Sequence, residues 1–285
     1  MTETTTMPEA PSTPQLDLDA YLARIGRPGE RDPSAASLRA LAFAHVTSIP
    51  FENLDPLRGS APSLALPDLE AKLVRAPRGG YCYEQNTLFA AALRALGFTV
   101  TGLAARVRVG ARGALRPRTH MLLLVEVPGE REPYVADVGF GSIGGLLEAV
   151  PLAADTEFHD GIRRHRFVRE PRPGHEDLWV LQAFLDGADG AWEDQYAFTL
   201  EPCERPDYEI FNWYVATHPR SPFRRTLHVQ RTTADRHLAL SGHTLTETDR
   251  DGTRAQRELA DEAEVLAVLA AEFGIEAPEG VQLPR

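Results

Sequence analysis

The chain has 285 residues, 43% hydrophobic and 25% charged, a composition typical of a globular protein of about two domains. Its 41 acidic residues outnumber its 30 basic ones, and the net charge of −11 argues against general nucleic-acid binding, which requires a basic surface. The sequence has no apolar run of about 18 residues and only 2 cysteines. We therefore expect no membrane partner, no disulfide framework and no metal site.

The first 15 residues, MTETTTMPEAPSTPQ, have neither the basic segment nor the apolar segment of a secretory signal. Their polar, proline-containing composition predicts a disordered tail. We therefore expect a cytoplasmic location.

Helical patterns dominate the first third of the chain. Apolar residues recur at helical spacing in four segments, which are predicted to be helices: residues 17–26, 32–46, 66–74 and 82–98. Asp32 and Pro33 have the residue types that favour the N-cap and the first helical position, so they are predicted to begin the second helix. Gly97 is predicted to end the fourth.

Strand patterns follow Gly97. Runs of apolar and β-branched residues between turn-prone segments predict strands over residues 99–109, 119–127, 134–140, 178–185, 195–200, 226–233 and 237–242. Two further helices are predicted over residues 208–219 and 261–273. Because helices come first and strands follow as a group, the sequence predicts an α+β protein.

The stretch RGGYCYEQ, residues 78–85, contains a candidate nucleophile. Cys82 stands at the predicted start of a helix, where unpaired backbone N–H groups and the helix dipole stabilise a thiolate. Gly79 and Gly80 would let the chain turn tightly and leave the thiol open to a substrate. A merely structural cysteine would fit the same place, because free cysteine is among the most buried residue types.

Two polar residues beside apolar runs are candidate partners for this thiol. His120 precedes the run MLLLVEV, and Asp137 lies within YVADVGF, where an unpaired carboxylate would be costly. Their spacing suits two neighbouring strands, so Asp137 would orient His120 and His120 would activate Cys82. His45 and His218 are weaker candidates for the base, because neither has such a carboxylate beside it in sequence.

Several motifs in register resemble the arylamine N-acetyltransferase family. They are IPFENLDPL (49–57), RGGYCYEQN (78–86), RTHMLLLV (118–125), DVGFG (137–141) and NWYVATHPRSPF (212–223). The resemblance extends over roughly residues 34–230. It implies an N-terminal helical bundle over residues 16–97, a central antiparallel β-barrel over residues 98–204 and a C-terminal α/β lid over residues 205–285.

The resemblance also implies roles for individual residues. Cys82 would be the nucleophile, His120 the base and Asp137 the carboxylate that orients the base. The positions implied to line the acyl-acceptor pocket are Phe51, Tyr83, Val107 and Phe140, and those implied to lie near coenzyme A are Thr119, Gly141 and Ser142. Arg78 and Glu52 would form an ion pair that positions the cysteine loop.

The activity implied by the resemblance is acetyl transfer from acetyl-CoA to small arylamines or hydrazines. Acetyl-CoA would be a co-substrate, and no permanently bound cofactor is expected. The reaction would run in two steps through an acetyl-cysteine, as in other covalent acyl transfers. Aromatic side chains around the thiol would suit the rings of such amines.

Three alternatives remain open at the level of sequence. An amide synthase of the same family would use the same three residues to release a polyketide from a carrier protein as a macrolactam. A cysteine peptidase or transglutaminase-like enzyme would also use them, although the residues around Cys82 lack the CGSCW signature of papain-like peptidases. In a non-catalytic binding module, Cys82 would simply be buried.

Residues 72–118 contain nine basic residues and one acidic residue, Glu84. Such a stretch is usually a solvated face. The alternative is that it attracts the phosphates of coenzyme A to the candidate site.

Overall fold

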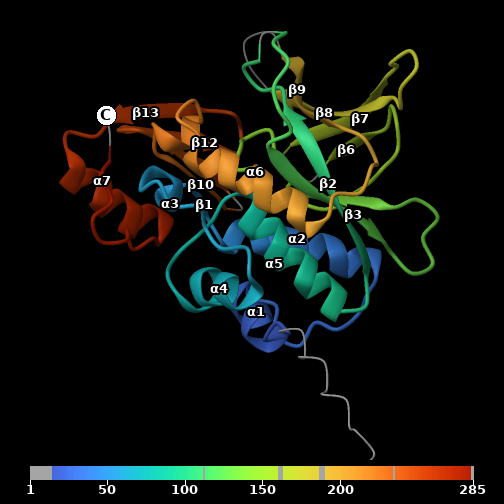
Figure 1. The fold of residues 1–285 in the computed structure, drawn as a ribbon, viewed down its shortest axis with the longest axis horizontal. Coiled ribbons are helices and arrows are strands. Elements are labelled where there is room, and N and C mark those ends of the chain that lie inside the picture. The colour runs from blue at the N-terminus through green and yellow to red at the C-terminus, as the bar shows by residue number, and fades with distance from the viewer. Residues whose placement is uncertain (1–14, 112, 160–162, 186–189, 234, 284–285) are drawn as a thin grey trace, which may run out of the picture.

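The computed structural model describes residues 15–111, 113–159, 163–185, 190–233 and 235–283 (Figure 1). Of the tail predicted over residues 1–15, only Gln15 is among them. A helical N-terminal region, a barrel-like sheet and a second, smaller sheet follow one another along the chain. Within the described residues, no helix combines the length and the apolar character needed to cross a membrane.

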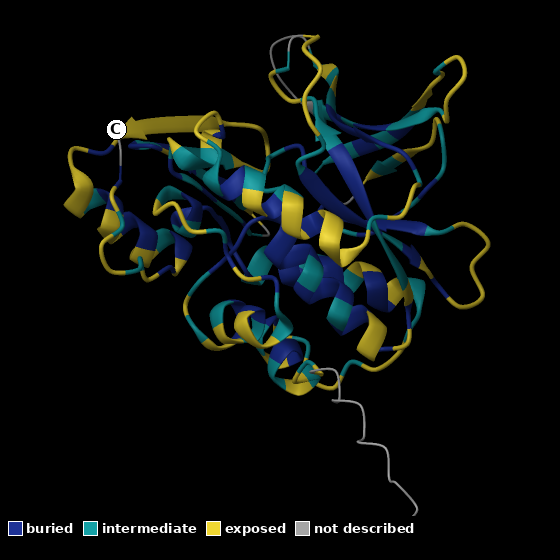
Figure 2. Ribbon diagram, viewed as in Figure 1, coloured by how far each residue is buried: buried dark blue, intermediate teal, exposed yellow. Residues whose placement is uncertain are grey.

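The N-terminal region is made of short helices around one buried helix. The bounds of the helices are α1 Leu18–Arg24, α2 Ala35–Ser48, α3 Leu54–Leu57, α4 Leu66–Leu69 and α5 Cys82–Ala95, and a π-helical segment, Glu70–Arg75, continues α4. Most residues of α5 are buried, and the helix lies at the centre of the molecule (Figure 2). The residue that begins α5 is therefore held on several sides.

The helix α2 begins later than its sequence predicts. Ser34, and not Asp32, is the N-cap, and its hydroxyl accepts a hydrogen bond from the backbone N–H of Ser37. Pro33 precedes the helix instead of occupying its first turn. A serine hydroxyl caps a helix as well as a carboxylate does, and a proline disfavours helical geometry in the residue before it.

Eight antiparallel strands form a nearly closed, barrel-like sheet in the order β5-β4-β3-β2-β9-β8-β7-β6. Their bounds are β2 Thr99–Val107, β3 His120–Glu126, β4 Tyr134–Ala136, β5 Val150–Pro151, β6 Glu157–His159, β7 Arg164–Glu170, β8 Leu178–Leu185 and β9 Ala191–Phe198. Alternate residues point inward and form a core that includes Leu103, Leu122, Phe167 and Phe198. This core fixes the strand ends that meet α5.

The C-terminal region contains α6, Arg205–Thr217, a 3₁₀ turn, Pro222–Arg224, and then a five-stranded sheet. The strands of this sheet are β1 Phe51–Glu52, β10 His228–Thr232, β11 Arg236–Ser241, β12 Thr244–Asp249 and β13 Arg254–Glu258. Helix α7, Glu262–Val268, and a π-helical turn, Leu269–Phe273, pack on one face over a separate apolar core. The two-residue strand β1 pairs with β10, so the PFEN motif joins the C-terminal sheet.

Strands β3 and β4 bring the candidate partners of Cys82 to one end of the barrel. They pair antiparallel, with Leu123 opposite Ala136. His120 is the first residue of β3, and β4 ends at Ala136, so Asp137 follows the strand rather than lying within it as predicted. The direction of its side chain is therefore not set by the inward–outward alternation of the strand, and the side chain contacts the first turns of α5.

Candidate active site

Cys82 is the first residue of α5 and is only 4% exposed. Its Sγ lies 3.8 Å from the backbone oxygen of Thr119, the residue before His120. The thiol is thus placed between a helix N-terminus, which favours a thiolate, and the first residues of β3.

His120 links the thiol to Asp137. Its Nε2 lies 2.6 Å from Asp137 Oδ2, and both side chains are buried. Burial alone would lower the pKa of His120, but the charge of Asp137, the hydrogen bond to it and the hydrogen bond to Cys82 outweigh burial and raise that pKa to about 10. The imidazole is therefore protonated at neutral pH, in the form that stabilises a neighbouring thiolate.

Asp137 is oriented by two donors that none of the sequence motifs indicates. Asn86 Nδ2 donates to Asp137 Oδ1 at 3.1 Å and to the Met121 carbonyl at 2.8 Å. The backbone N–H of Gly139 also donates to Asp137 Oδ1, at 3.1 Å. One amide on α5 thus ties the helix of the nucleophile to β3 and to the carboxylate.

Aromatic rings enclose the imidazole. The ring centroids of Phe140 and Tyr196 each lie 5.0 Å from that of His120, and 5.0 Å from one another. Tyr196 lies on β9, far from the other site residues in sequence, and no sequence motif indicates its place in the site. Burial, followed by the charge of Asp137, raises the pKa of Tyr196 well above its ordinary value. Its hydroxyl therefore stays neutral beside the carboxylate.

The predicted acceptor and coenzyme positions fall into two groups. Phe51, Phe140, Gly141 and Ser142 line a small cavity of about 30 Å³ that also touches Asp137. Tyr83 is fully buried and packs against the rings of Tyr81 and Tyr208. Val107 is half-buried at the end of β2, opposite Tyr196. Neither Tyr83 nor Val107 lines this cavity.

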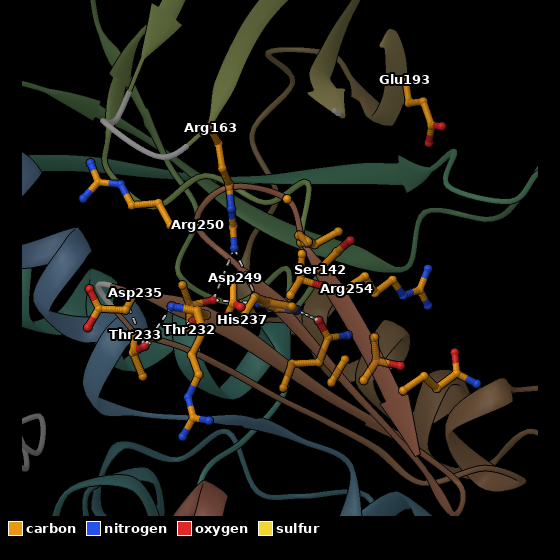
Figure 3. A pocket seen from close by; sticks show the side chains of 18 of the residues that line it. Ser142, Arg163, Glu193, Thr232, Thr233, Asp235, His237, Asp249, Arg250 and Arg254 are labelled. Atoms are coloured by element: carbon orange, nitrogen blue, oxygen red, sulfur yellow. Dashed lines mark hydrogen bonds between the residues drawn. The ribbon is translucent and has the colours of Figure 1, made fainter. Parts of the chain in front are cut away.

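A much larger cleft, of about 750 Å³, lies between the barrel and the C-terminal sheet (Figure 3). One face of β11 and β12 supplies short polar side chains, among them Ser241, Thr244 and Thr246. Ser142 and Arg163 lie at the junction with the small cavity, because they line both. The cleft therefore extends from the surroundings of Asp137 along the polar face of the sheet.

Arg163 bridges the two walls of this cleft (Figure 3). Its guanidinium donates to the Gly145 carbonyl at 2.8 Å and lies 3.5 Å from Thr232 Oγ1 and from His237 Nδ1. Burial, together with the charge of Arg163, lowers the pKa of His237 to about 3. His237 is therefore neutral, and the charge at this junction is that of Arg163.

The loop before Cys82 rests on a group of buried charges that we call the buried ion cluster: Glu52, Asp55, Lys72, Arg78 and Glu84. Arg78 and Glu52, which the sequence resemblance paired, are in contact, with Arg78 Nε 2.8 Å from Glu52 Oε1. Lys72 and Asp55 extend the pair, and Glu84 joins it from α5. The cluster is thus larger than the pair that the sequence indicated.

The basic stretch over residues 72–118 does not form a row of unpaired cations. Lys72 and Arg78 belong to the buried ion cluster, and the other described members donate to carboxylates or carbonyls of the protein: Arg75, Arg94, Arg106, Arg108, Arg116 and Arg118. Arg112 lies outside the described residues. These internal partners speak against the stretch as a general attractor of phosphates.

The other candidate bases are occupied elsewhere. His45 bonds Tyr21 through Nδ1 and Gln85 through Nε2, and burial lowers its pKa to about 3. His218 caps the C-terminus of α6 and stacks on Tyr214. Among the residues that the structure describes, no group of three or more His, Cys, Asp or Glu side chains could hold a metal ion.

A buried thiol at a helix N-terminus, beside a histidine–aspartate pair at the end of a barrel-like sheet, is the arrangement expected of enzymes with a Cys-His-Asp triad. Comparisons with known proteins identify the family within this class. A family model described as N-acetyltransferase matches residues 34–280. The arylamine N-acetyltransferase of Mycolicibacterium smegmatis is 40% identical over 265 residues, or 92% of each chain.

Solved structures agree with this match. The crystal structure of Nocardia farcinica arylamine N-acetyltransferase has a TM-score of 0.86 and 46% identity, covering 95% of each chain. The structure of Mycobacterium marinum arylamine N-acetyltransferase in complex with CoA has a TM-score of 0.84 and 36% identity, covering 91% of this chain and 93% of the other. The chain belongs to the arylamine N-acetyltransferase family, and it is an acyltransferase.

Proposed function

We propose that the chain transfers an acetyl group from acetyl-CoA to arylamines and hydrazines through an acetyl-Cys82 intermediate. The observation that carries this proposal is the 2.6 Å contact of His120 with Asp137 beside the thiol of Cys82, whose Sγ lies 3.8 Å from the backbone oxygen of Thr119, the residue before His120. The family relationship and the CoA complex of the Mycobacterium marinum enzyme support the choice of donor. The relatives reported above carry the name arylamine N-acetyltransferase, which supports the choice of acceptor.

The first half-reaction forms the acetyl-enzyme. The reacting groups are the thiolate form of Cys82 and the His120 imidazolium. The thiolate attacks the carbonyl carbon of the thioester, a new C–S bond forms to Cys82, and the C–S bond to coenzyme A breaks. The His120 imidazolium gives its proton to the departing thiolate, so coenzyme A leaves as a thiol.

The second half-reaction uses the neutral imidazole left by the first. The amine nitrogen attacks the acetyl-cysteine, and His120 Nδ1 takes the proton that the nitrogen loses. The bond between the acetyl carbon and Cys82 breaks, which restores the thiolate and the imidazolium. Asp137 keeps the imidazole in one orientation throughout, and because it occupies Nε2, Nδ1 is the nitrogen proposed to exchange the proton.

The large cleft is the proposed place for the body of the donor. Cys82 is nearly inaccessible, so only a thin group can reach it, and the pantetheine arm of coenzyme A is such a group. The cleft has the volume for a ligand of that size and meets the small cavity at Ser142 and Arg163. Thr119, Gly141 and Ser142 are proposed to flank the arm, and Phe51 and Phe140 the acceptor ring. Tyr83 and Val107 remain proposed acceptor-side positions.

Steady-state kinetics with acetyl-CoA and a simple arylamine test this proposal. We expect parallel double-reciprocal lines, as two separate half-reactions require, and no turnover by Cys82→Ala. Intersecting lines, or turnover by Cys82→Ala, would rule the intermediate out. Inertness toward acetyl-CoA combined with turnover of a carrier-bound acyl chain would replace the proposal with amide synthesis.

A further inference from the structure

The buried ion cluster draws its members from five separate segments of the chain. Glu52 comes from β1, Asp55 from α3, Lys72 from the π-helical segment, Arg78 from the loop before Cys82 and Glu84 from the first turn of α5. Their side chains are between 0 and 18% exposed. A group of charges that is so far removed from solvent is costly unless each charge has partners.

Lys72 lies at the centre of this cluster. Its Nζ is 2.6 Å from Asp55 Oδ2, 2.6 Å from Glu84 Oε1 and 3.9 Å from Glu52 Oε1. Burial would lower the pKa of Lys72, but the charges of the three carboxylates outweigh burial and raise it. The ammonium group is therefore a permanent cation.

Glu84 connects Lys72 to the backbone next to the nucleophile. Its Oε1 accepts from Lys72, and its Oε2 accepts the backbone N–H of Tyr81, the residue before Cys82, at 3.2 Å. The carboxylate also lies against Gly80, where an added Cβ would come within 2.9 Å of Glu84 Oε2. Through Glu84, Lys72 is thus connected to the backbone of the loop that positions the thiol.

The charges of the cluster do not balance. Three carboxylates face two cations, so one negative charge remains when every group is ionised. Burial raises the pKa of Glu84, the charge of Lys72 opposes this, and Glu52 and Asp55 add to it, which brings the pKa to about 7. Glu84 is therefore the member whose charge depends most on its neighbours.

We propose that Lys72 is a positioning residue for the nucleophile of the reaction proposed above. Its ammonium group favours the ionised form of Glu84, and ionised Glu84 fixes the backbone of Tyr81 and so the position of Cys82. The acidic neighbours of Glu84 are Glu52 on β1 and Asp55 on α3, and its basic neighbours are Lys72 and, at the far side of the cluster, Arg78. Lys72 thus acts on Cys82 through Glu84 rather than through substrate.

Alkylation of Cys82 by iodoacetamide, followed by intact mass at a series of pH values, tests this role. The Cys203→Ala background removes the second thiol. We expect the wild-type rate to rise with a midpoint near the Glu84 pKa of about 7. In Lys72→Met the midpoint moves upward by about one pH unit, and the rate at pH 7 falls about fivefold. Lys72→Arg restores the wild-type profile, because it keeps the cation.

A double variant tests whether Lys72 acts through Glu84. We expect Glu84→Gln to lack the rise in the Cys82 alkylation rate near pH 7. We expect Lys72→Met in the Glu84→Gln background to change that rate little further. Arg75→Met, on the same π-helical segment but paired with Asp17 and Glu70 at the surface, is the control and keeps the wild-type profile.

Three results would overturn the proposal: a wild-type profile in Lys72→Met, equal losses from Lys72→Met with and without Glu84, or a step that persists in Glu84→Gln. If Lys72→Met does not fold, Lys72→Gln, which also lacks the cation, takes its place. Alkylation needs neither acetyl-CoA nor an amine, so a failure of the proposed acetyl transfer would show separately.

Discussion

His120 Nε2 lies 2.6 Å from Asp137 Oδ2 inside the protein, and this contact couples folding to pH. The pKa of His120 rises from 6.5 to about 10 on folding. A raised pKa contributes stability that is fully present below pH 6.5 and is lost as the pH rises through about 10. The protein is therefore expected to lose stability over that alkaline range.

Asp137→Asn removes the charge that raises this pKa most. We expect the stability gap between wild type and Asp137→Asn to be largest just below pH 6.5 and to shrink as the pH rises toward about 10, because the histidine contribution is lost over that range. Urea unfolding at several pH values measures the gap. A gap that does not change with pH would contradict the assignment of the His120 shift to Asp137.

Asn86 is the second residue on which the triad depends. Asn86→Ala removes the donor to Asp137 Oδ1 and leaves the Met121 carbonyl without this partner. Loss of a hydrogen bond to a charged group corresponds to about 10- to 100-fold in rate. We expect kcat/KM for acetyl-CoA and an arylamine to fall by that factor. Thr87→Ala, on the next residue of α5, is the control, and an equal loss there would indicate a general disturbance of the helix.

The sequence contains an indication of a buried polar side chain near Asn86, although residue types alone do not identify its partners. Glu84, Gln85 and Asn86 are three consecutive polar residues in a helix, and all three are buried. At 100° per residue they spread over about 200° of the helix, so at least one must face the protein interior. The signal predicts a buried polar network near Cys82, but its partners come from other segments and appear only in the folded chain.

At the scale of elements, Gly139 lets α5 approach the segment after β4. A Cβ at Gly139 would lie 2.7 Å from Cys82 Cα, a backbone atom that cannot move without shifting the helix. Gly139→Ala is expected to cost about 1–3 kcal/mol, lower Tm by several degrees and reduce the alkylation rate of Cys82. Gly174→Ala is the control, because φ is +77° there and space is open, so the substitution strains the backbone without a steric collision. Equal reactivity of the two variants would count against the close contact.

Helix α5 is predicted closely, because its long apolar face and terminal glycine are strong local signals. Strand β7 is not predicted, because RHRFVRE contains only His165 and Phe167 as inward residues between charged ones. These two side chains are buried by contacts with the rest of the barrel, which the local sequence does not reveal. Local chemistry thus determines the helix, whereas pairing with β6 and β8 determines the strand.

At the scale of the whole molecule, the large cleft depends on contacts between distant segments. Its C-terminal wall is held to the helical region by β1, whose two residues carry no strand pattern of their own. The sequence therefore predicts the triad, through three separate local motifs, but not the cleft that lies beside it. The cleft is visible only when the barrel and the C-terminal sheet are placed together (Figure 3).

Arg254 on β13 lines this cleft and is suited to a phosphate of the donor. We expect Arg254→Ala to raise KM for acetyl-CoA several-fold while kcat changes little, since Arg254 does not line the small cavity that touches Asp137. Arg257→Ala is the matched control, because Arg257 lies on the same strand but pairs with Glu264. Equal effects of the two variants would place the donor elsewhere.

The mass of the intact protein after incubation with acetyl-CoA, without an amine, tests the covalent role of Cys82 most directly. We expect one added acetyl group on Cys82 and its loss when an arylamine is supplied, together with no acetylation of Cys82→Ala. An unmodified protein that nevertheless acetylates the amine, or an acetyl group that stays on the protein when the amine is added, would contradict the mechanism.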